Sequence, residues 1–160
     1  REKPSFACTA SFSSLLFYQR RSLRRGGFFM RAPLDAEADR TDLAWAVLAD
    51  IACSTHEQLQ HLVELTGNEG GPILGCGGGF QSEALCQMLS DLSGRELRLR
   101  AGFRQATVQG LVTLCNDYLG EVPAKRDSAL KTYHPRTGQL IHQYAPAWRE
   151  ARDRANDIKA

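Results

Sequence analysis

One stretch decides how this sequence folds: Ile73-Leu74-Gly75-Cys76-Gly77-Gly78-Gly79-Phe80-Gln81-Ser82. Its first four residues predict a short buried strand, and the three glycines that follow predict a tight turn. A helix is expected from Gln81 to Leu92, because apolar residues recur there on one face. Glycines let backbone N–H groups approach a ligand closely, and the start of a helix is electropositive. The pattern therefore favours a nucleotide, held by its phosphates or by its ribose and base; plain tight packing is the alternative.

Upstream of this stretch, a long helix is predicted from Asp39 onward. Asp39 or Thr41 can cap its start, and Gly67 can supply the left-handed residue that ends it. Apolar residues at helical spacing predict a broad buried stripe. The stripe comprises Leu43, Ala44, Val47, Leu48, Ile51, Ala52, Leu59, Leu62 and Val63.

Downstream, Glu96–Arg100 alternates polar and apolar residues, which is typical of a half-buried strand. A third helix is predicted for Gln105–Leu119, then a loop over residues 121–138, and then a last amphipathic helix. The third helix is expected to bury Val108, Leu111, Val112 and Cys115, and the last to bury Ile141, Tyr144, Trp148, Ala151 and Ala155. This alternation of helices and strands indicates an α/β layer.

Two common phosphate-binding motifs do not fit the glycine-rich turn. The run from Gly75 nearly reads G-x-G-x-x-G, but Phe80 stands where the third glycine should allow close helix–strand packing. The acid expected about 20 residues later is replaced by Arg98 and Arg100. No Gly-Lys-Ser/Thr follows the glycines, so a Walker loop is excluded as well.

A wider pattern is more informative than any single motif. Its parts, in order, are Gly77-Gly78-Gly79-Phe80-Gln81-Ser82, Gln87, Asp91, Gly94, Ala101-Gly102, Gln105-Ala106-Thr107 and Gly110. With the preceding helix Asp42–Leu48, the Tyr133-His134-Pro135 loop and the Tyr144–Trp148 segment, this order resembles the carboxy-terminal domain of the FGGY carbohydrate kinases, of the rhamnulokinase or xylulokinase type. The resemblance covers roughly residues 39–150.

The resemblance implies an actin-like, ribonuclease H-like α/β fold in which two domains close over ATP and a sugar. With Mg²⁺, such a kinase transfers the γ-phosphoryl group of ATP to a sugar hydroxyl. Gly77, Gly78, Gly79, Gln81 and Ser82 carry over as nucleotide-binding residues, near the adenosine part of the nucleotide. The general base belongs to the amino-terminal domain of such kinases, so no catalytic residue and no metal ligand is assigned here. The isolated chain is accordingly expected to have no kinase activity.

Three departures from the family pattern keep a second interpretation open. Ser82 replaces an asparagine, Ala49-Asp50 replaces Glu-Gly, and Gln105 replaces a glutamate. A non-catalytic nucleotide-binding or regulatory module of the same fold is therefore the alternative. No nucleic-acid or membrane partner is expected, although a basic arm at residues 1–31 could contact either. We expect a cytoplasmic protein, with a homodimer possible.

Composition and charge set the domain division. The chain has 160 residues, 42% hydrophobic and 24% charged, which excludes a collagen, a disordered tail and a disulfide scaffold. Residues 1–31 carry a net charge of +6 and residues 32–160 a net charge of −4. Residues 1–38 are therefore interpreted as a basic, irregular lead-in, formed by strands and loops of a truncated domain. Residues 39–160 are interpreted as the carboxy-terminal, nucleotide-side domain.

The cysteines indicate neither a disulfide framework nor a zinc site. There are five of them, widely spaced, with no C-x-x-C pair. Reduced, mostly buried thiols are expected.

Overall fold

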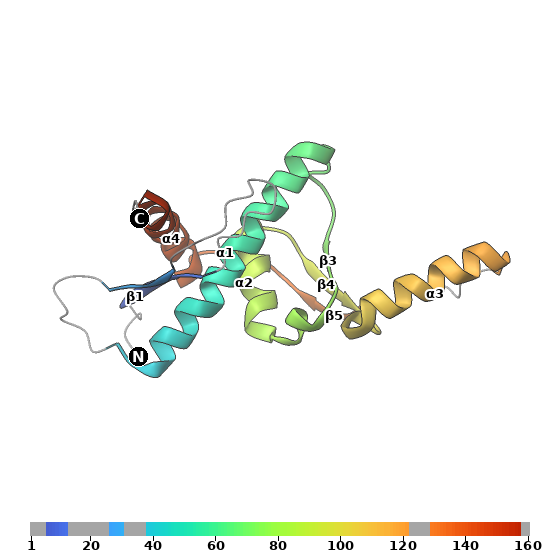
Figure 1. The fold of residues 1–160 in the computed structure, drawn as a ribbon, viewed down its shortest axis with the longest axis horizontal. Helices are drawn as coiled ribbons and strands as arrows, with labels where there is room; N and C mark the ends of the chain where they lie inside the picture. Colours follow the sequence, from blue (N-terminus) through green and yellow to red (C-terminus); the bar gives the residue numbers. More distant parts are fainter. Residues whose placement is uncertain (1–5, 13–25, 31–37, 122–128, 158–160) are drawn as a thin grey trace. The chain divides into compact units, whose positions relative to one another are not determined.

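The computed structural model describes residues 6–12, 26–30, 38–121 and 129–157 (Figure 1). They form two compact units. The first unit, made of the described residues up to Glu69 and from Arg136 onward, contains β1 (Cys8–Ser11), β2 (Gly27–Met30), α1 (Arg40–Thr66) and α4 (Leu140–Asp157). The second, Gly70–Pro135, contains β3 (Ile73–Gly75), η2 (Gly78–Gln81), α2 (Glu83–Ser93), β4 (Leu97–Arg100), η3 (Phe103–Gln105), α3 (Ala106–Leu119) and β5 (Ala129–Tyr133).

Helix α1 begins and ends at the residues that the sequence predicts. The Asp39 carboxylate accepts hydrogen bonds from the backbone N–H groups of Thr41 (2.7 Å) and Asp42 (2.9 Å). The Asp42 carboxylate accepts one in return from the Asp39 N–H (3.0 Å), which completes a capping box. At the other end, Gly67 adopts φ 64°, and its N–H donates to the Val63 carbonyl.

The buried face of α1 differs from the expected stripe. Ala44 is exposed, Ile51 is 39% exposed and Leu62 is 55% exposed, so the prediction is wrong for these three side chains. The buried residues are Ala52, as predicted, and Ala46, Ala49, Asp50, Cys53 and Ser54, which were not predicted. These small side chains let strand β1 and helix α4, which both contact α1, approach its backbone closely. Leu43 and Val47, from the expected stripe, are partly buried and pack against Cys8, Ala10 and Ala46.

Strand β1 is held against both helices by one tyrosine. The Tyr144 hydroxyl accepts a hydrogen bond from the Ala10 N–H (3.0 Å) and donates one to the Ala46 carbonyl (3.2 Å). Strands β1 and β2 pair antiparallel, with Cys8 opposite Met30. The seven Lys and Arg residues within residues 1–31 all lie outside the described residues.

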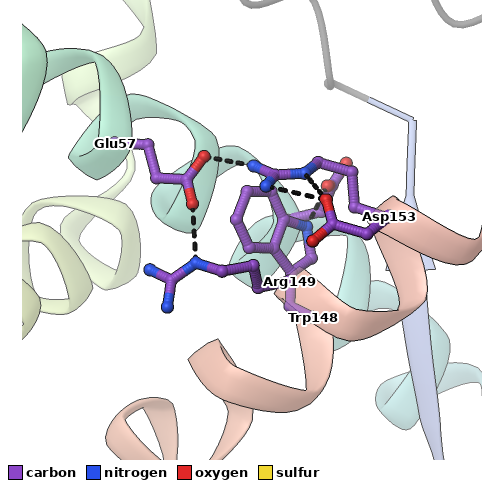
Figure 2. A network of polar contacts seen from close by, with 6 residues as sticks. Glu57, Trp148, Arg149 and Asp153 are labelled. Atoms are coloured by element: carbon purple, nitrogen blue, oxygen red, sulfur yellow. Dashed lines mark hydrogen bonds and ion pairs between the residues drawn. The ribbon is translucent and has the colours of Figure 1, made fainter. Parts of the chain in front are cut away.

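Helix α4 is anchored by a buried carboxylate. Asp50 is fully buried and accepts hydrogen bonds from the Phe12 N–H (2.9 Å) and the Trp148 indole N–H (2.6 Å). The Arg152 guanidinium carbon lies 4.8 Å from the centroid of the Trp148 ring. Glu57 of α1 forms ion pairs with Arg149 and Arg152 of α4, and Figure 2 shows the pairing with Arg149. The expected burial of Tyr144 and Trp148 is confirmed.

The second unit is built on a three-stranded sheet in the order β3-β4-β5. Strands β3 and β4 are parallel, and β4 and β5 are antiparallel. Leu97 and Leu99 are buried, whereas Arg98 and Arg100 alternate with them on the exposed face. The prediction of a loop over residues 121–138 is wrong for Ala129–Tyr133. These residues form a strand because they pair with the backbone of β4. No alternation of polar and apolar residues in their sequence predicts this pairing.

Helix α3 has the predicted bounds within one residue but not the predicted packing. None of its residues is buried; Val108, Leu111 and Val112 are 59%, 61% and 44% exposed, and Cys115 is exposed. The expected burial is therefore wrong among the described residues, because η3 is the main element in contact with α3. Open space surrounds the Cα of Gly110, so it is not a site of close helix packing in this unit.

All five cysteines are free, and Cys8, Cys53 and Cys86 are buried, as expected of reduced thiols. Burial raises the pKa of Cys53 to about 12, so this thiol is unreactive at neutral pH. Across the described parts of the chain, no helix is both long enough and apolar enough to cross a bilayer.

The buried Asp50 gives a stability prediction for the first unit. The substitution Asp50→Ala leaves the buried Trp148 N–H and the partly buried Phe12 N–H without an acceptor, so the free energy of unfolding should fall by about 2–4 kcal/mol. Urea titration followed by tryptophan fluorescence reports this unit alone, since both tryptophans, Trp45 and Trp148, belong to it. Asp153→Ala is the control, because that side chain is 60% exposed, and the change should stay within about 0.5 kcal/mol. Equal effects of the two substitutions would contradict the prediction.

Candidate nucleotide-binding site

Two turns meet at one edge of the sheet in the second unit. Because β3 and β4 are parallel neighbours, their carboxyl ends lie at the same edge. The turn after β3 is joined to the turn after β4 by a hydrogen bond of 2.7 Å from the Gly77 N–H to the Phe103 carbonyl. Open α/β sheets bind their ligands at the carboxyl ends of the strands. This edge is therefore the candidate site.

The glycine turn presents unused backbone donors. Gly77 has φ 102° and ψ 170°, a conformation that is essentially restricted to glycine. The chain then winds into η2, where the Phe80 N–H donates to the Gly77 carbonyl (3.3 Å) and the Ser82 N–H to the Gly79 carbonyl (3.2 Å). The N–H groups of Gly78 and Gly79 donate to no described residue. They are available to a ligand.

The structure brings the five predicted site residues together on this one turn. Gly78, Gly79 and Gln81 are exposed, and Gly77 is half-buried. The Gln81 side chain forms no hydrogen bond with any described residue, and its amide nitrogen lies 3.7 Å from where a Cβ of Gly78 would be. Ser82 is used differently, because its hydroxyl accepts a hydrogen bond from the Leu85 N–H (3.3 Å) and caps helix α2.

Phe80 fills the space that a third glycine would leave open. A Cβ at Gly75 would lie 2.7 Å from Leu99 Cδ2 and 2.8 Å from Phe80 Cδ1. Strand β3 must therefore carry glycine at position 75, since the Phe80 ring and the Leu99 side chain close over its Cα. The sequence departs from G-x-G-x-x-G because Phe80 replaces the third glycine, and its aromatic ring packs against Gly75.

The second turn depends on Gly102. This residue has φ 77°, a conformation that favours glycine, and a Cβ there would lie 1.6 Å from Gln109 Nε2, so the glutamine side chain would have to move. The Gln105 N–H donates to the Gly102 carbonyl (2.9 Å), which tightens η3. Sequence reasoning singled out Gly102 and Gln105, but it missed Phe103 and Gln109. A backbone carbonyl such as that of Phe103 leaves no signal in residue type.

Gln87 and Asp91 have a structural role in this unit. The Gln87 amide donates to the buried Asp91 carboxylate (2.9 Å) and to the His134 carbonyl (2.8 Å). This ties helix α2 to the end of β5. Neither side chain is part of the glycine turn.

The titratable groups near α2 are already paired or buried. Glu83, in the first turn of α2, forms an ion pair with Lys131 of β5. Burial raises the pKa of the Cys86 thiol and of the Tyr133 hydroxyl, so both stay protonated at neutral pH. Within the described residues, no three His, Cys, Asp or Glu side chains lie close enough to hold a metal ion.

Comparison with known proteins identifies this arrangement. Residues 4–116 match the family model of the FGGY family of carbohydrate kinases, C-terminal domain. The chain belongs to the FGGY family of carbohydrate kinases. It is also 32% identical over 148 residues to a Bacillus subtilis (strain 168) protein named "Putative sugar kinase YoaC". That alignment covers 92% of this chain and 30% of the relative, so the chain spans about a third of the curated protein it matches.

Solved FGGY-type structures share the fold. Gluconate kinase from Lactobacillus acidophilus superposes with a TM-score of 0.64 at 17% identity, over 85% of this chain and 28% of that one. Xylulose kinase from Rhodospirillum rubrum superposes with a TM-score of 0.62 at 14% identity, over 93% of this chain and 31% of that one. The expected fold class, the carboxy-terminal part of an actin-like sugar-kinase fold, is confirmed.

The packing at Gly75 yields a prediction with a built-in control. Gly75→Ala forces a methyl group into two side chains, so the second unit should lose about 1–3 kcal/mol of stability. Gly79→Ala adds the same methyl group where no atom lies within 4 Å, and it should change stability little. Hydrogen exchange measured on peptides from α2 and β4 distinguishes the two variants. Faster exchange in both variants, or in neither, would contradict the packing of Phe80 and Leu99 against Gly75.

Proposed function

We propose that the chain is the nucleotide-side part of an ATP-dependent carbohydrate kinase, which converts ATP and a sugar to ADP and a sugar phosphate. The observation that carries the proposal is the pair of unused N–H donors at Gly78 and Gly79, at the carboxyl edge of two parallel strands in a chain of this family. Backbone N–H groups of this kind hydrogen-bond phosphate or ribose oxygens. The whole protein would combine this part with an amino-terminal domain that binds the sugar and supplies the general base.

Each residue of the turn has a distinct part in this proposal. Gly77 supplies the backbone conformation that exposes the turn, and Gly78 and Gly79 donate their N–H groups. Gln81 offers an exposed amide that can both donate and accept. Ser82 contributes mainly by starting helix α2, because its hydroxyl oxygen already accepts from the Leu85 N–H.

The described residues do not fit a resident Mg²⁺ at this edge. Between Cys76 and Ser82, and between Arg100 and Gly110, the charged residues are Arg100 and Arg104, and guanidinium groups do not bind cations. We therefore assign no metal ligand in this part of the chain. Mg²⁺ belongs to the proposal as the ion that accompanies ATP in the whole protein.

The remaining expectations are part of the same proposal. We keep the division into a lead-in, residues 1–38, and a carboxy-terminal domain, residues 39–160. A cytoplasmic location and a homodimer also remain proposals. A non-catalytic nucleotide-binding or regulatory module is the second candidate function, favoured by the use of the Ser82 hydroxyl as a helix cap.

Nucleotide binding is tested by filling the turn. Gly79→Leu places a side chain in the open space above the free N–H groups, so it should weaken ADP binding at least about tenfold without unfolding the unit. Gly70→Leu is the matched control, because it adds the same side chain in open space outside the turn and should leave binding unchanged. Isothermal titration calorimetry measures both. Unchanged ADP affinity in Gly79→Leu would remove the turn from the nucleotide site.

Catalysis is tested separately from binding. The 160-residue chain, given ATP, Mg²⁺ and a panel of ketoses, aldonates and deoxysugars, should release no ADP above background, because one wall of the cleft cannot position both reactants. Addition of an FGGY amino-terminal domain, expressed in one chain with it, should produce sugar-dependent ADP release. Turnover by the chain alone would refute the proposal that catalysis requires the amino-terminal domain. Nucleotide binding without turnover in the fused protein would favour the non-catalytic module.

A further inference from the structure

Two arginines at the candidate site have no acidic partner among the described residues. Arg100, at the end of β4, and Arg104, in η3, are exposed and form no ion pair or hydrogen bond with any described residue. Nearby arginines are engaged: Arg95 donates to the carbonyls of Gly71 (2.9 Å) and Gly70 (2.7 Å), and Arg98 donates to Glu96 (2.6 Å). Arg100 ends β4 and Arg104 follows it in η3, so the backbones of both residues lie at the carboxyl edge of the sheet.

The backbone of Arg104 is fixed beside the glycine turn. Its neighbour Phe103 is buried and accepts the hydrogen bond from the Gly77 N–H (2.7 Å). Gly102 adopts φ 77°, and the Gln105 N–H donates to its carbonyl (2.9 Å), which holds together the turn that carries Arg104. The guanidinium carbon of Arg104 lies 5.8 Å from the centroid of the Phe103 ring. The hydrogen bond between Gly77 and Phe103 thus joins the backbone next to Arg104 to the turn that carries the N–H groups of Gly78 and Gly79.

The charges at this edge all have one sign. Between Cys76 and Ser82 and between Arg100 and Gly110 the sequence contains two arginines and no acid. Glu83, the first acid after the turn, is paired with Lys131. A guanidinium group binds phosphate oxygens through two parallel N–H donors. A neutral ligand would make no use of these charges.

We propose that Arg104, assisted by Arg100, binds the 5′-phosphate of the nucleotide, the phosphate attached to the ribose. This inference rests on the nucleotide-binding function proposed above. It assigns the anionic end of the ligand to the η3 turn and leaves the ribose and base to the glycine turn. Arg104 would then determine that the site prefers a nucleotide to a nucleoside.

The test compares ligands that differ only in phosphate. Calorimetric titration of the full chain with adenosine, AMP and ADP should show AMP and ADP binding more tightly than adenosine. In Arg104→Gln, the affinities for AMP and ADP should fall about tenfold, because a charge-assisted hydrogen bond is lost, and the affinity for adenosine should not change. Arg104→Lys should recover part of the loss. Arg98→Gln is the control, because its partner Glu96 already occupies that guanidinium, and it should match the unsubstituted chain.

The outcomes separate this inference from the function it rests on. If the unsubstituted chain binds neither adenosine nor any of its phosphates, both are overturned. If it binds adenosine and AMP equally well, or if Arg104→Gln weakens adenosine and AMP alike, the nucleotide site stands and the role of Arg104 is overturned. If raising the KCl concentration weakens AMP binding in the unsubstituted chain but not in Arg104→Gln, the role of the charge is supported.

Discussion

The hydrogen bond from the Gly77 N–H to the Phe103 carbonyl is the contact on which the candidate site depends. It joins two turns that leave neighbouring parallel strands, so the glycine turn and the η3 turn form one surface. Gly75 and Gly102 allow this arrangement, since a Cβ at Gly75 would strike Leu99 and Phe80, and Gly102 adopts φ 77°. Both glycines lie outside the run Gly77–Gly79. Their residue type is visible in the sequence, but the packing and the backbone conformation that require glycine there are not.

In the first unit, the side chain of Asp50 is fully buried. Asp50 stands where the family pattern has glycine, and it receives N–H groups from strand β1 and from the Trp148 indole of helix α4. A buried carboxylate is costly unless its oxygens are hydrogen-bonded, and here both are. The small residues on the same face of α1 give Tyr144 access to the Ala46 carbonyl. The replacement of Glu-Gly by Ala-Asp is thus accommodated by the structure without loss of packing.

Structural features that depend on neighbouring residues were predicted correctly from the sequence. Features that depend on residues far along the chain were not. Asp39 and Gly67 mark the ends of α1 because capping involves only neighbouring residues. The glycine turn was likewise predicted from residues that are adjacent in the chain. The burial of α3 and the loop over residues 121–138 were predicted wrongly, because exposure and strand pairing depend on partners far along the chain. Phe103 was missed because its contribution is a backbone carbonyl.

The hydrogen bonds of Tyr144 and Trp148 also bear on the order in which the chain can fold during synthesis. They join residues up to 134 positions apart, and all of Gly70–Pro135 lies between α1 and α4 in the sequence. A ribosome releases strand β1 and helix α1 before helix α4, yet the Tyr144 hydroxyl and the Trp148 indole N–H, which bond to them, come with α4. The second unit, which carries the glycine turn, consists of 66 consecutive residues. It can therefore fold before helix α4 is available to complete the first unit. Of the two units, the one whose first residues are synthesised earlier is therefore the one completed later.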